Sequence, residues 1–311
     1  MNKSNYFAYS VMYHYVKESK TNQYKNFKFL DYNKFKSQIN YFLKTFNILS
    51  LDDFIDLKET KKILKKPPLL LTFDDGYLDH YDYVYPYLLE KKIKGLFYPP
   101  ARIIEKNFIL DVNKIHFILS KVNDKKIILN EIKGYLKKNT TFIFDEFELK
   151  QINTKSRFDN KETILIKRLL QYFLPLKIRI NLVTFLFKKF VNLNTTEVSS
   201  KLYMKRNHIV EMIKDGMHFG SHGYNHHWFN FIPYKEQEIE IKKSCTFLRS
   251  LNKKESALTI CYPYGSYNKD TIKILKKYNF KLGFTSLPGK IKMFEKKNNL
   301  ILPRFDTNDF F

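Results

Sequence analysis

Apolar and polar residues follow two patterns along this chain, and the shorter pattern predicts strands. Residues 69–77 read LLLTFDDGY, an uninterrupted apolar run that follows Pro67 and Pro68 and stops at two aspartates and Gly76. A run of strand length with these boundaries predicts a strand buried on both faces, as in a parallel sheet. Further strands are expected at residues 8–16, 95–100, 217–222, 258–262, 282–285 and 300–305.

The longer pattern, with apolar residues three and four positions apart, predicts helices between these strands. Pro86 should kink or delay the helix expected at residues 81–92, and Pro175 should break the one expected at residues 161–192 into two pieces. Strands that alternate with helices in this way predict an α/β fold with a mainly parallel sheet. The helices are expected at residues 32–46, 81–92, 112–122, 161–192, 207–215, 235–251 and 269–277.

Two carboxylates follow the apolar run LLLTF directly. In parallel sheets the carboxyl ends of the strands face the ligand crevice, so Asp74 and Asp75 stand where chemistry is usually done. Adjacent strand residues point to opposite sides unless the chain bends, and Gly76 permits that bend. Two carboxylates at such a place are costly to desolvate unless a metal ion or hydrogen-bond donors meet them. The pair therefore suggests a search for other metal ligands.

A second group of candidate ligands lies far downstream, in the segment HFGSHGYNHHW at residues 218–228. His222 and His226 are four positions apart, and on a helical turn that spacing places two imidazoles on one face. One aspartate and two histidines would form a three-ligand site with an open position for water, as expected of a catalytic divalent ion such as zinc. The remaining aspartate could then serve as a base.

Each of these features has a simpler explanation when it is taken alone. An Asp-Asp pair after a strand is more often a helix N-cap with a first-turn charge, and a His pair at this spacing is usually incidental. A third segment, CYPYGSYN at residues 261–268, makes their joint occurrence more informative.

Together these three segments resemble the polysaccharide deacetylase family, which is carbohydrate esterase family 4 and carries the NodB-homology domain. TFDDG at residues 72–76 matches the first motif of that family, and SHGYNH at residues 221–226 matches the second. PYG at residues 263–265 matches the core of the third motif, and VMYHYV at residues 11–16 is similar to the first strand of many members.

The resemblance implies an irregular seven-stranded (β/α) barrel of the NodB-homology type, formed by residues 1–100 and 206–311. The family usually needs only some tens of residues between its first two motifs, so residues 101–205 are expected to be a mainly helical insertion subdomain. The insertion contains KRLLQYFLPLKIRINLVTFLFKKF at residues 167–190, which is both basic and strongly apolar. Such a segment is typical of membrane-surface helices, but we favour a small subdomain whose apolar faces pack together.

The resemblance also assigns roles to individual residues. Asp74 would be the general base, and Asp75, His222 and His226 would hold one divalent metal ion. Zn²⁺ is expected first, although Co²⁺, Ni²⁺ and Fe²⁺ suit the same ligands. The backbone N–H of Tyr264 would help to hold the oxyanion.

The chain departs from the family at two positions. Members commonly carry an arginine that steadies the base aspartate three places before the tyrosine of the third motif, where this chain has Cys261. Arg304, in the segment ILPRFD, is the candidate substitute, and an ordinary surface or packing arginine is the other interpretation. The Leu-x-His motif that supplies the general acid is not visible, so the acid is open among His14, His80, His218 and His227.

The composition bears on partners and location. The net charge is +24, but the lysines are spread out and no helix-turn-helix, RNP or zinc-finger pattern is present, so nucleic acid is not expected. The two cysteines, Cys245 and Cys261, provide neither a disulfide framework nor a zinc-binding pattern. Since the sequence shows no secretory signal and no run of about 18 apolar residues, we expect a cytoplasmic protein. The basic insertion would allow peripheral contact with the inner face of an anionic membrane.

The expected function is therefore metal-dependent removal of an N-acetyl or N-formyl group from a sugar, oligosaccharide or polysaccharide precursor, in the assembly or modification of a surface glycan. One alternative keeps this chemistry but places it on a lipid-linked sugar at the membrane surface. The other is a catalytically inactive carbohydrate-binding protein with the same fold.

Overall fold

The computed structural model describes residues 6–18, 27–142, 152, 159–251, 257–295 and 299–310. By their internal contacts, the residues of the chain form two compact units. Unit 1 comprises residues 1–21, 29–107 and 199–311, and unit 2 comprises residues 22–28 and 108–198.

Unit 1 contains a closed ring of parallel strands. Within the described part of the chain, seven strands form this ring. They are β1 (Phe7–Tyr13), β5 (Pro68–Asp74), β6 (Leu96–Tyr98), β7 (His218–Phe219), β8 (Thr259–Cys261), β9 (Leu282–Phe284) and β11 (Phe305–Asp306). β1 pairs with β5, β5 with β6, and β6 with β7. A parallel bridge from Ser221 to Ile260 leads to β8, which pairs with β9. A second bridge, from Phe284 to Leu302, leads to β11, which pairs with β1 and closes the ring.

Two short strands extend this ring, and two others form a pair of their own. β10 (Ile291–Lys292) is antiparallel to β1, and β4 (Asn47–Ile48) pairs with the start of β5. β2 (Val16–Lys17) and β3 (Leu30–Asp31) form a separate parallel pair. The predicted α/β class with a mainly parallel sheet is therefore confirmed.

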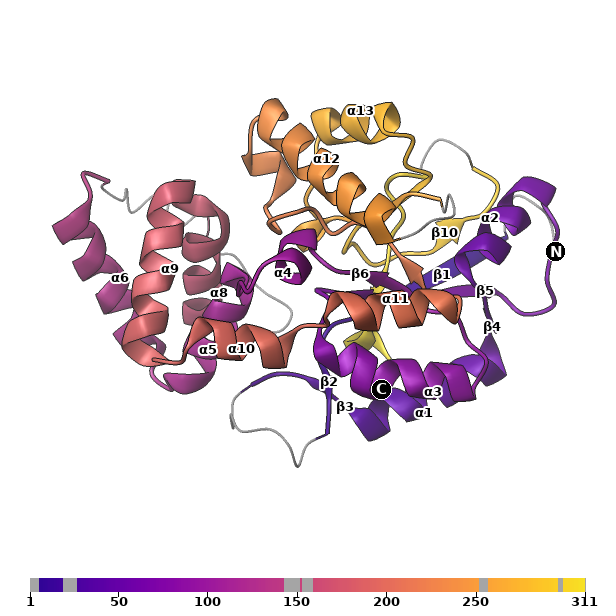
Figure 1. The fold of residues 1–311 in the computed structure, drawn as a ribbon, viewed down its shortest axis with the longest axis horizontal. Helices are drawn as coiled ribbons and strands as arrows, with labels where there is room; N and C mark the ends of the chain where they lie inside the picture. Colours follow the sequence, from indigo (N-terminus) through magenta and orange to yellow (C-terminus); the bar gives the residue numbers. More distant parts are fainter. Residues whose placement is uncertain are drawn as a thin grey trace. The chain divides into compact units, whose positions relative to one another are not determined.

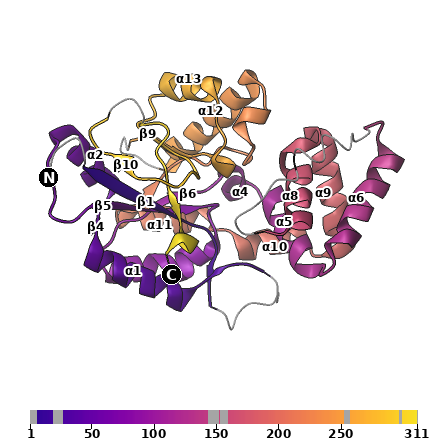
Figure 2. The same ribbon diagram turned by 180° about the vertical axis from the view of Figure 1, so that it is seen from behind.

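Helices of unit 1 cover the strands from two sides. Figures 1 and 2 show α1, α3 and α11 on one side of the strands and α12 with α13 on the other. Pro86 lies in the first turn of α3, and a π-helical segment precedes it, so the expected helix is interrupted where the proline predicted. The helices and helical turns are α1 (Tyr32–Thr45), α2 (Leu51–Thr60), η3 (His80–Val84), α3 (Tyr85–Glu90), α4 (Ala101–Glu105), α11 (Arg206–Lys214), η5 (Phe229–Phe231), α12 (Tyr234–Leu251), η6 (Pro263–Gly265), α13 (Lys269–Lys277) and η7 (Thr307–Asp309).

Strand β5 is buried along its whole length, as its apolar run predicted. Its residues alternate between two hydrophobic clusters, because successive strand side chains point to opposite faces. Leu71 and Phe73 pack with residues of α1, α3 and α11, whereas Leu70 packs inside the ring with residues of other strands such as Leu96 and Phe284. The strand is thus fixed from both sides, and so is the position of its carboxyl end.

Unit 2 is a group of helices. They are α5 (Asp111–Lys121), α6 (Lys125–Asn139), α8 (Lys161–Arg168), the π-helical η4 (Leu169–Phe173) and α9 (Leu176–Phe190). Pro175 separates η4 from α9, as expected. The apolar stripe of α9, which includes Leu182, Val183, Leu186 and Phe187, is buried within the unit. This burial agrees with the interpretation of residues 167–190 as a packed subdomain.

None of the helices that the structure describes is long and apolar enough to cross a membrane. α10 (Thr195–Leu202) contains the boundary between the two units.

Candidate metal centre and catalytic site

The predicted site residues of unit 1 follow the carboxyl ends of different strands. Asp74 ends β5 and Asp75 comes directly after it, while His222 follows β7 and its bridge at Ser221. Tyr264 lies three residues beyond β8. Since parallel strands end at the same edge of a barrel, residues that are distant in sequence meet here.

Asp75, His222 and His226 form the cluster that the motifs predicted. Their candidate ligand atoms all lie within 4.8 Å of one another, and all three residues are buried. Asp75 Oδ1 is 3.5 Å from His222 Nε2 and 3.2 Å from His226 Nε2, yet this buried oxygen has no hydrogen-bond partner of good geometry. A buried carboxylate oxygen that faces two imidazole nitrogens without hydrogen bonds fits a divalent ion held between them.

The histidine pair reaches this arrangement without a helix, and the helical turn expected from its spacing is wrong. Residues 222–228 are irregular, and His226 has a φ of 63°. Asp75 and Tyr264 also have positive φ angles, of 68° and 58°. Such backbone conformations cost on the order of 1–3 kcal/mol each for non-glycine residues and persist only where the surrounding structure imposes them. Their concentration at one place is typical of a functional site.

The bend after β5 explains how two adjacent carboxylates reach the same side. Gly76 has a φ of 65°, and a Cβ at this position would lie 2.6 Å from the Cβ of Pro99. Asp75 N–H donates to the carbonyl of Tyr98 at 3.1 Å, which ties the turn to β6. The turn therefore requires glycine at position 76, as the sequence indicated.

Hydrogen bonds outside the cluster orient the ligands. His222 Nδ1 lies 2.7 Å from the carbonyl oxygen of Cys261, so the ring donates there and presents Nε2 to Asp75. The Tyr77 hydroxyl donates to Asp75 Oδ2 at 2.7 Å, which leaves Oδ1 for the cluster. Burial raises the pKa of Asp75, but its contacts with His222 and His226 outweigh burial and hold that pKa well below the ordinary range.

Glu240 of α12 holds the loop between the two histidines. Its side chain is only 3% exposed, and Oε2 accepts the backbone N–H groups of Tyr224 at 3.0 Å and Asn225 at 2.7 Å. The Asn225 side-chain amide donates to Oε1. A buried carboxylate thus replaces the missing helical hydrogen bonds of this segment and positions His226.

Asp74 pairs with Arg304, which is 1% exposed. Both guanidinium Nη atoms contact the carboxylate, Nη1 at 2.9 Å and Nη2 at 2.8 Å. Arg304 also donates to Thr72 Oγ1, to Cys261 Sγ and to the carbonyl of Thr285. Burial raises the pKa of Asp74, but the Arg304 charge and hydrogen bonds, together with His222 and His14, outweigh burial and lower this pKa to about 2. The interpretation of Arg304 as an ordinary surface arginine is therefore wrong.

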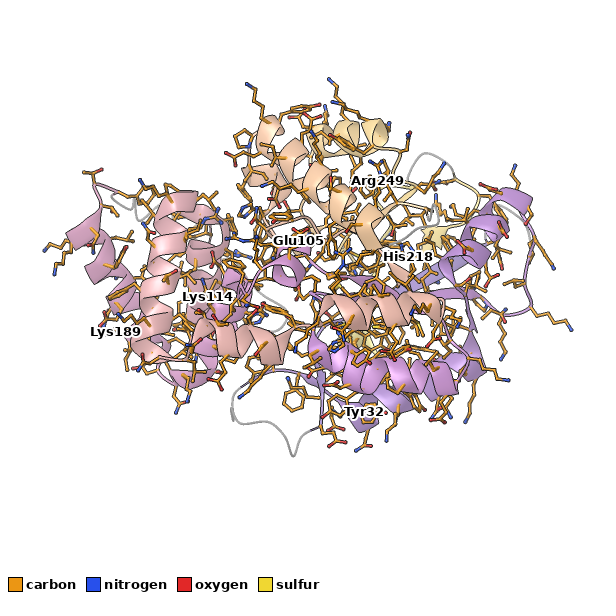
Figure 3. The ribbon with its side chains drawn as sticks, in the orientation of Figure 1. Tyr32, Glu105, Lys114, Lys189, His218 and Arg249 are labelled. Atoms are coloured by element: carbon orange, nitrogen blue, oxygen red, sulfur yellow. The ribbon has the colours of Figure 1, made fainter. Side chains whose placement is uncertain are left out.

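The four histidines considered for the acid occupy different environments. His14 Nε2 lies 4.0 Å from Asp74 Oδ2, and its side chain is 42% exposed. His80 is buried, with Nε2 2.6 Å from the His14 carbonyl oxygen, and burial lowers its pKa to about 4. His218, labelled in Figure 3, is held in β7 with Nε2 2.7 Å from Thr259 Oγ1, and burial lowers its pKa to about 3. His227 is partly exposed and follows the ligand His226 directly.

Tyr264 lies beside the cluster. Its ring is edge-on to His226, with centroids 4.7 Å apart. The Trp228 ring stacks on the Tyr264 ring, with centroids 4.5 Å apart. The position agrees with the predicted place of the third motif, while the role of the Tyr264 N–H stays a prediction.

Sequence reasoning missed the supporting residues of this site. Tyr77 is part of the quoted run LLLTFDDGY, so its place beside Asp75 could have been suspected. Glu240 resembles any other charged residue of a Glu- and Lys-rich helix, and nothing local marks it.

Residues 158–283 match the family model for polysaccharide deacetylase. The matched range includes His222, His226 and Tyr264. YxkH of Bacillus subtilis, which its name assigns to the polysaccharide deacetylases, is 26% identical over 92 residues. This match covers 30% of the chain and only 33% of the relative.

Solved deacetylases have the same fold. The Streptococcus pyogenes deacetylase PplD, in complex with acetate, gives a TM-score of 0.58 at 17% identity, with 96% of this chain and 92% of that one covered. A de-N-acetylase from Aggregatibacter actinomycetemcomitans gives 0.58 at 15% identity, with 98% and 97% covered. IcaB from Ammonifex degensii gives 0.56 at 16% identity, with 97% and 91% covered.

The fold and the cluster define a parallel β/α barrel with a candidate metal centre at the carboxyl ends of its strands, and the NodB-type barrel is confirmed. Since the family model matches the segments that carry the second and third motifs, the predicted resemblance is confirmed as well. Over residues 158–283 the chain is similar to the polysaccharide deacetylase family, and its fold is that of solved deacetylases.

Proposed function

We propose that this protein is a metal-dependent hydrolase that removes the N-acetyl group from an amino sugar within an oligosaccharide or polysaccharide. The observation that carries the proposal is one arrangement in unit 1. A buried Asp-His-His cluster fit for a divalent ion lies directly beside a second carboxylate, which an arginine keeps ionised. Acetyl is preferred over formyl because the PplD structure, which shares this fold, was solved with acetate.

Asp75, His222 and His226 would hold the ion, which when bound supplies a Lewis acid to polarise the amide carbonyl and a water molecule. Zinc suits two imidazoles and one carboxylate with an open position. Asp74, ionised beside Arg304, then takes the proton from the attacking water.

The remaining steps need a donor for the oxyanion and an acid for the leaving amine. Tyr264 lies next to the ligand His226, so its backbone N–H is our candidate for the oxyanion. His14 is our candidate for the acid, because it combines solvent exposure with a distance of 4.0 Å to Asp74. As the general acid, His14 would give a proton to the amine nitrogen as the carbon–nitrogen bond breaks.

These contacts favour an active enzyme over an inactive carbohydrate-binding protein. The inactive alternative drew support from Cys261 in place of the family's arginine and from the unassigned acid. Arg304, directly before β11, supplies the missing guanidinium, and His14 supplies an imidazole. A binding module would gain nothing from an Asp74 carboxylate that is buried and paired in this way.

Metal content and acid release, measured together, test the proposal. Wild type, Asp74→Asn, His226→Gln and the surface control Asp82→Asn would be analysed for bound zinc and assayed for acetate and formate with N-acetylated and N-formylated oligosaccharides. We expect about one zinc ion in all but His226→Gln. Acetate should come only from wild type and Asp82→Asn. Zinc-loaded wild type that releases neither acid from any substrate would overturn the proposal, and circular dichroism shows whether each variant is folded.

A further inference from the structure

A row of three aromatic rings leads from the metal-ligand cluster toward solvent. Tyr264 contacts the ligand His226 at 4.7 Å between ring centroids, and Trp228 stacks on Tyr264 at 4.5 Å with the planes 16° apart. Phe231 lies edge-on to Trp228 at 5.8 Å. His226 is 8% exposed, Tyr264 and Trp228 are partly exposed, and Phe231 is 49% exposed. We call Tyr264, Trp228 and Phe231 the aromatic row.

The backbone around the aromatic row is fixed by contacts of its own. Phe229, between Trp228 and Phe231 in sequence, is fully buried in a cluster with Tyr262 and Ile260. Asn230 N–H donates to Ser266 Oγ at 3.1 Å, and the Ser266 hydroxyl donates to the Asn230 side chain. These bonds join the loop that carries Trp228 and Phe231 to the loop that carries Tyr264. The rings are therefore held in place before a ligand arrives, which lowers the cost of ordering them on binding.

The position and chemistry of the row indicate what it binds. A single exposed aromatic residue needs no explanation, but Phe231 continues a contact series that begins at a metal ligand. Aromatic faces are electron-rich, and the C–H groups on one face of a pyranose ring complement them. A polysaccharide presents further pyranose rings on either side of the sugar whose amide is hydrolysed. A subsite for one of these neighbouring rings must lie beside the metal-ligand cluster, and the aromatic row begins there.

Building on the proposed function, we propose that the aromatic row is a sugar-binding subsite. It stacks on a pyranose ring adjacent to the N-acylated sugar at the metal centre, so that the protein prefers an oligosaccharide to the corresponding monosaccharide. Phe231 is a positioning residue in this arrangement, because it contacts the neighbouring sugar and not the reacting atoms.

Trp228 provides a readout that does not depend on turnover, because it is the one tryptophan of the chain. The zinc-loaded protein would be titrated with N-acetylglucosamine and its β-1,4-linked tetramer while the tryptophan emission is followed. The same ligands would be assayed for acetate release in wild type, Phe231→Ala and Phe231→Tyr. Ile239→Ala is the matched control, since Ile239 is 50% exposed in the same unit.

We expect the tetramer to change the emission at lower concentration than the monosaccharide. Phe231→Ala should weaken tetramer binding and lower its kcat/KM by about tenfold, the size of one good aromatic contact. It should leave the monosaccharide unchanged, and Phe231→Tyr should restore tetramer binding. Equal effects of Phe231→Ala and Ile239→Ala on the tetramer would overturn the subsite, and so would an equal loss for both ligands.

The outcomes also separate this proposal from the proposed function. Tetramer binding that depends on Phe231, without acetate release, would keep the subsite and reject the hydrolase. Acetate release without dependence on chain length or on Phe231 would keep the hydrolase and reject the subsite. N-acetyl, N-butyryl and N-hexanoyl glucosamine provide one more test. If the loss of activity in Phe231→Ala grew with the length of the acyl group, the aromatic row would bind acyl chains, and the sugar subsite would be overturned.

Discussion

Arg304 donates hydrogen bonds to both carboxylate oxygens of Asp74, from Nη1 to Oδ1 at 2.9 Å and from Nη2 to Oδ2 at 2.8 Å. In the sequence, 230 positions separate the two residues. Both side chains are almost fully buried. Cys261, which occupies the place of the family's usual arginine, contacts Arg304 Nη1 through its sulfur at 3.0 Å. The smaller cysteine side chain leaves room for the guanidinium of Arg304, the residue directly before β11. A guanidinium contact to Asp74 is thus present, but it comes from a different position in the chain.

Arg304→Gln should destabilise the protein and abolish activity. Removing one partner of a buried ion pair leaves the other charge unpaired, which costs about 3–5 kcal/mol of unfolding free energy. The stability and activity of Arg304→Lys should lie between those of Arg304→Gln and wild type, because lysine keeps the charge but cannot form the two parallel hydrogen bonds. Urea denaturation and acetate release measure both effects, with Arg249→Gln on the surface of α12 as the control. A stable and active Arg304→Gln variant would contradict the role of the pair.

Local patterns carried most of what the sequence predicted correctly. The apolar run of β5 predicts a doubly buried strand because every residue in it up to Asp74 is apolar except Thr72. The candidate metal cluster was predicted because its three residues lie in two short segments, each recognisable by itself. Helix α6 was not expected, since its buried residues form one narrow stripe, Ile128, Ile132 and Leu136, and Gly134 interrupts the pattern.

Long-range contacts could not be predicted. No local signal distinguishes Arg304 as the partner of Asp74 from Arg304 as a surface residue, because the choice depends on how the ring of strands closes. The histidine spacing was misread as helical for a related reason. Tyr224 and Asn225 donate their backbone N–H groups to Glu240 on α12 instead of to carbonyls of a helical turn, and the sequence does not show that contact.

Tyr77→Phe should weaken metal binding without changing the fold. The Tyr77 hydroxyl donates to Asp75 Oδ2 at 2.7 Å, while its ring stacks on Tyr15 with centroids 3.9 Å apart. Phenylalanine keeps the stacking and removes the hydrogen bond that orients Asp75. Loss of such a contact typically lowers metal affinity by about 10-fold to 100-fold. Competition with a zinc chelator measures this affinity.

Tyr81→Phe is the matched control for Tyr77→Phe. Its hydroxyl donates to Glu211, away from the cluster. Zinc affinity that is equal in wild type and both variants would show that Asp75 needs no support from Tyr77.

Glu240→Ala should release the loop that carries His226. The change removes the acceptor of two backbone N–H groups, at Tyr224 and Asn225, and each buried donor left unsatisfied costs about 1–3 kcal/mol. We expect lower thermal stability and zinc affinity reduced by about 10-fold or more, because His226 is no longer held in its positive-φ conformation. Differential scanning calorimetry and chelator competition provide the two measurements.

Glu238→Ala tests whether the effect is specific to that position. Glu238 lies on the same helix and pairs with Lys277 at the surface. Its loss should cost at most about 1 kcal/mol and leave zinc affinity unchanged. If Glu238→Ala and Glu240→Ala lowered zinc affinity equally, α12 as a whole, and not the Glu240 carboxylate, would be responsible.

Asp79 should make the stability of the protein fall as the pH rises. Burial raises the pKa of this carboxyl to about 6, even though Lys17 Nζ lies 3.0 Å away and opposes the shift, and the charge of Asp82 adds to it. The folded protein therefore binds the proton more tightly than the unfolded chain. The stabilisation is fully present below the unfolded pKa and is lost as the pH rises through the folded pKa. A shift of about two units corresponds to about 2–3 kcal/mol.

Asp79→Asn removes this titration and keeps the shape of the side chain. Between about pH 4 and pH 7, the unfolding free energy of the variant should rise relative to wild type by about 2–3 kcal/mol, as measured by urea denaturation at each pH. Asp52→Asn, which replaces an exposed carboxylate of α2, controls for the general effect of losing a negative charge. A difference between Asp79→Asn and wild type that stays constant over this range would mean that Asp79 is ionised in the folded protein throughout, held so by Lys17.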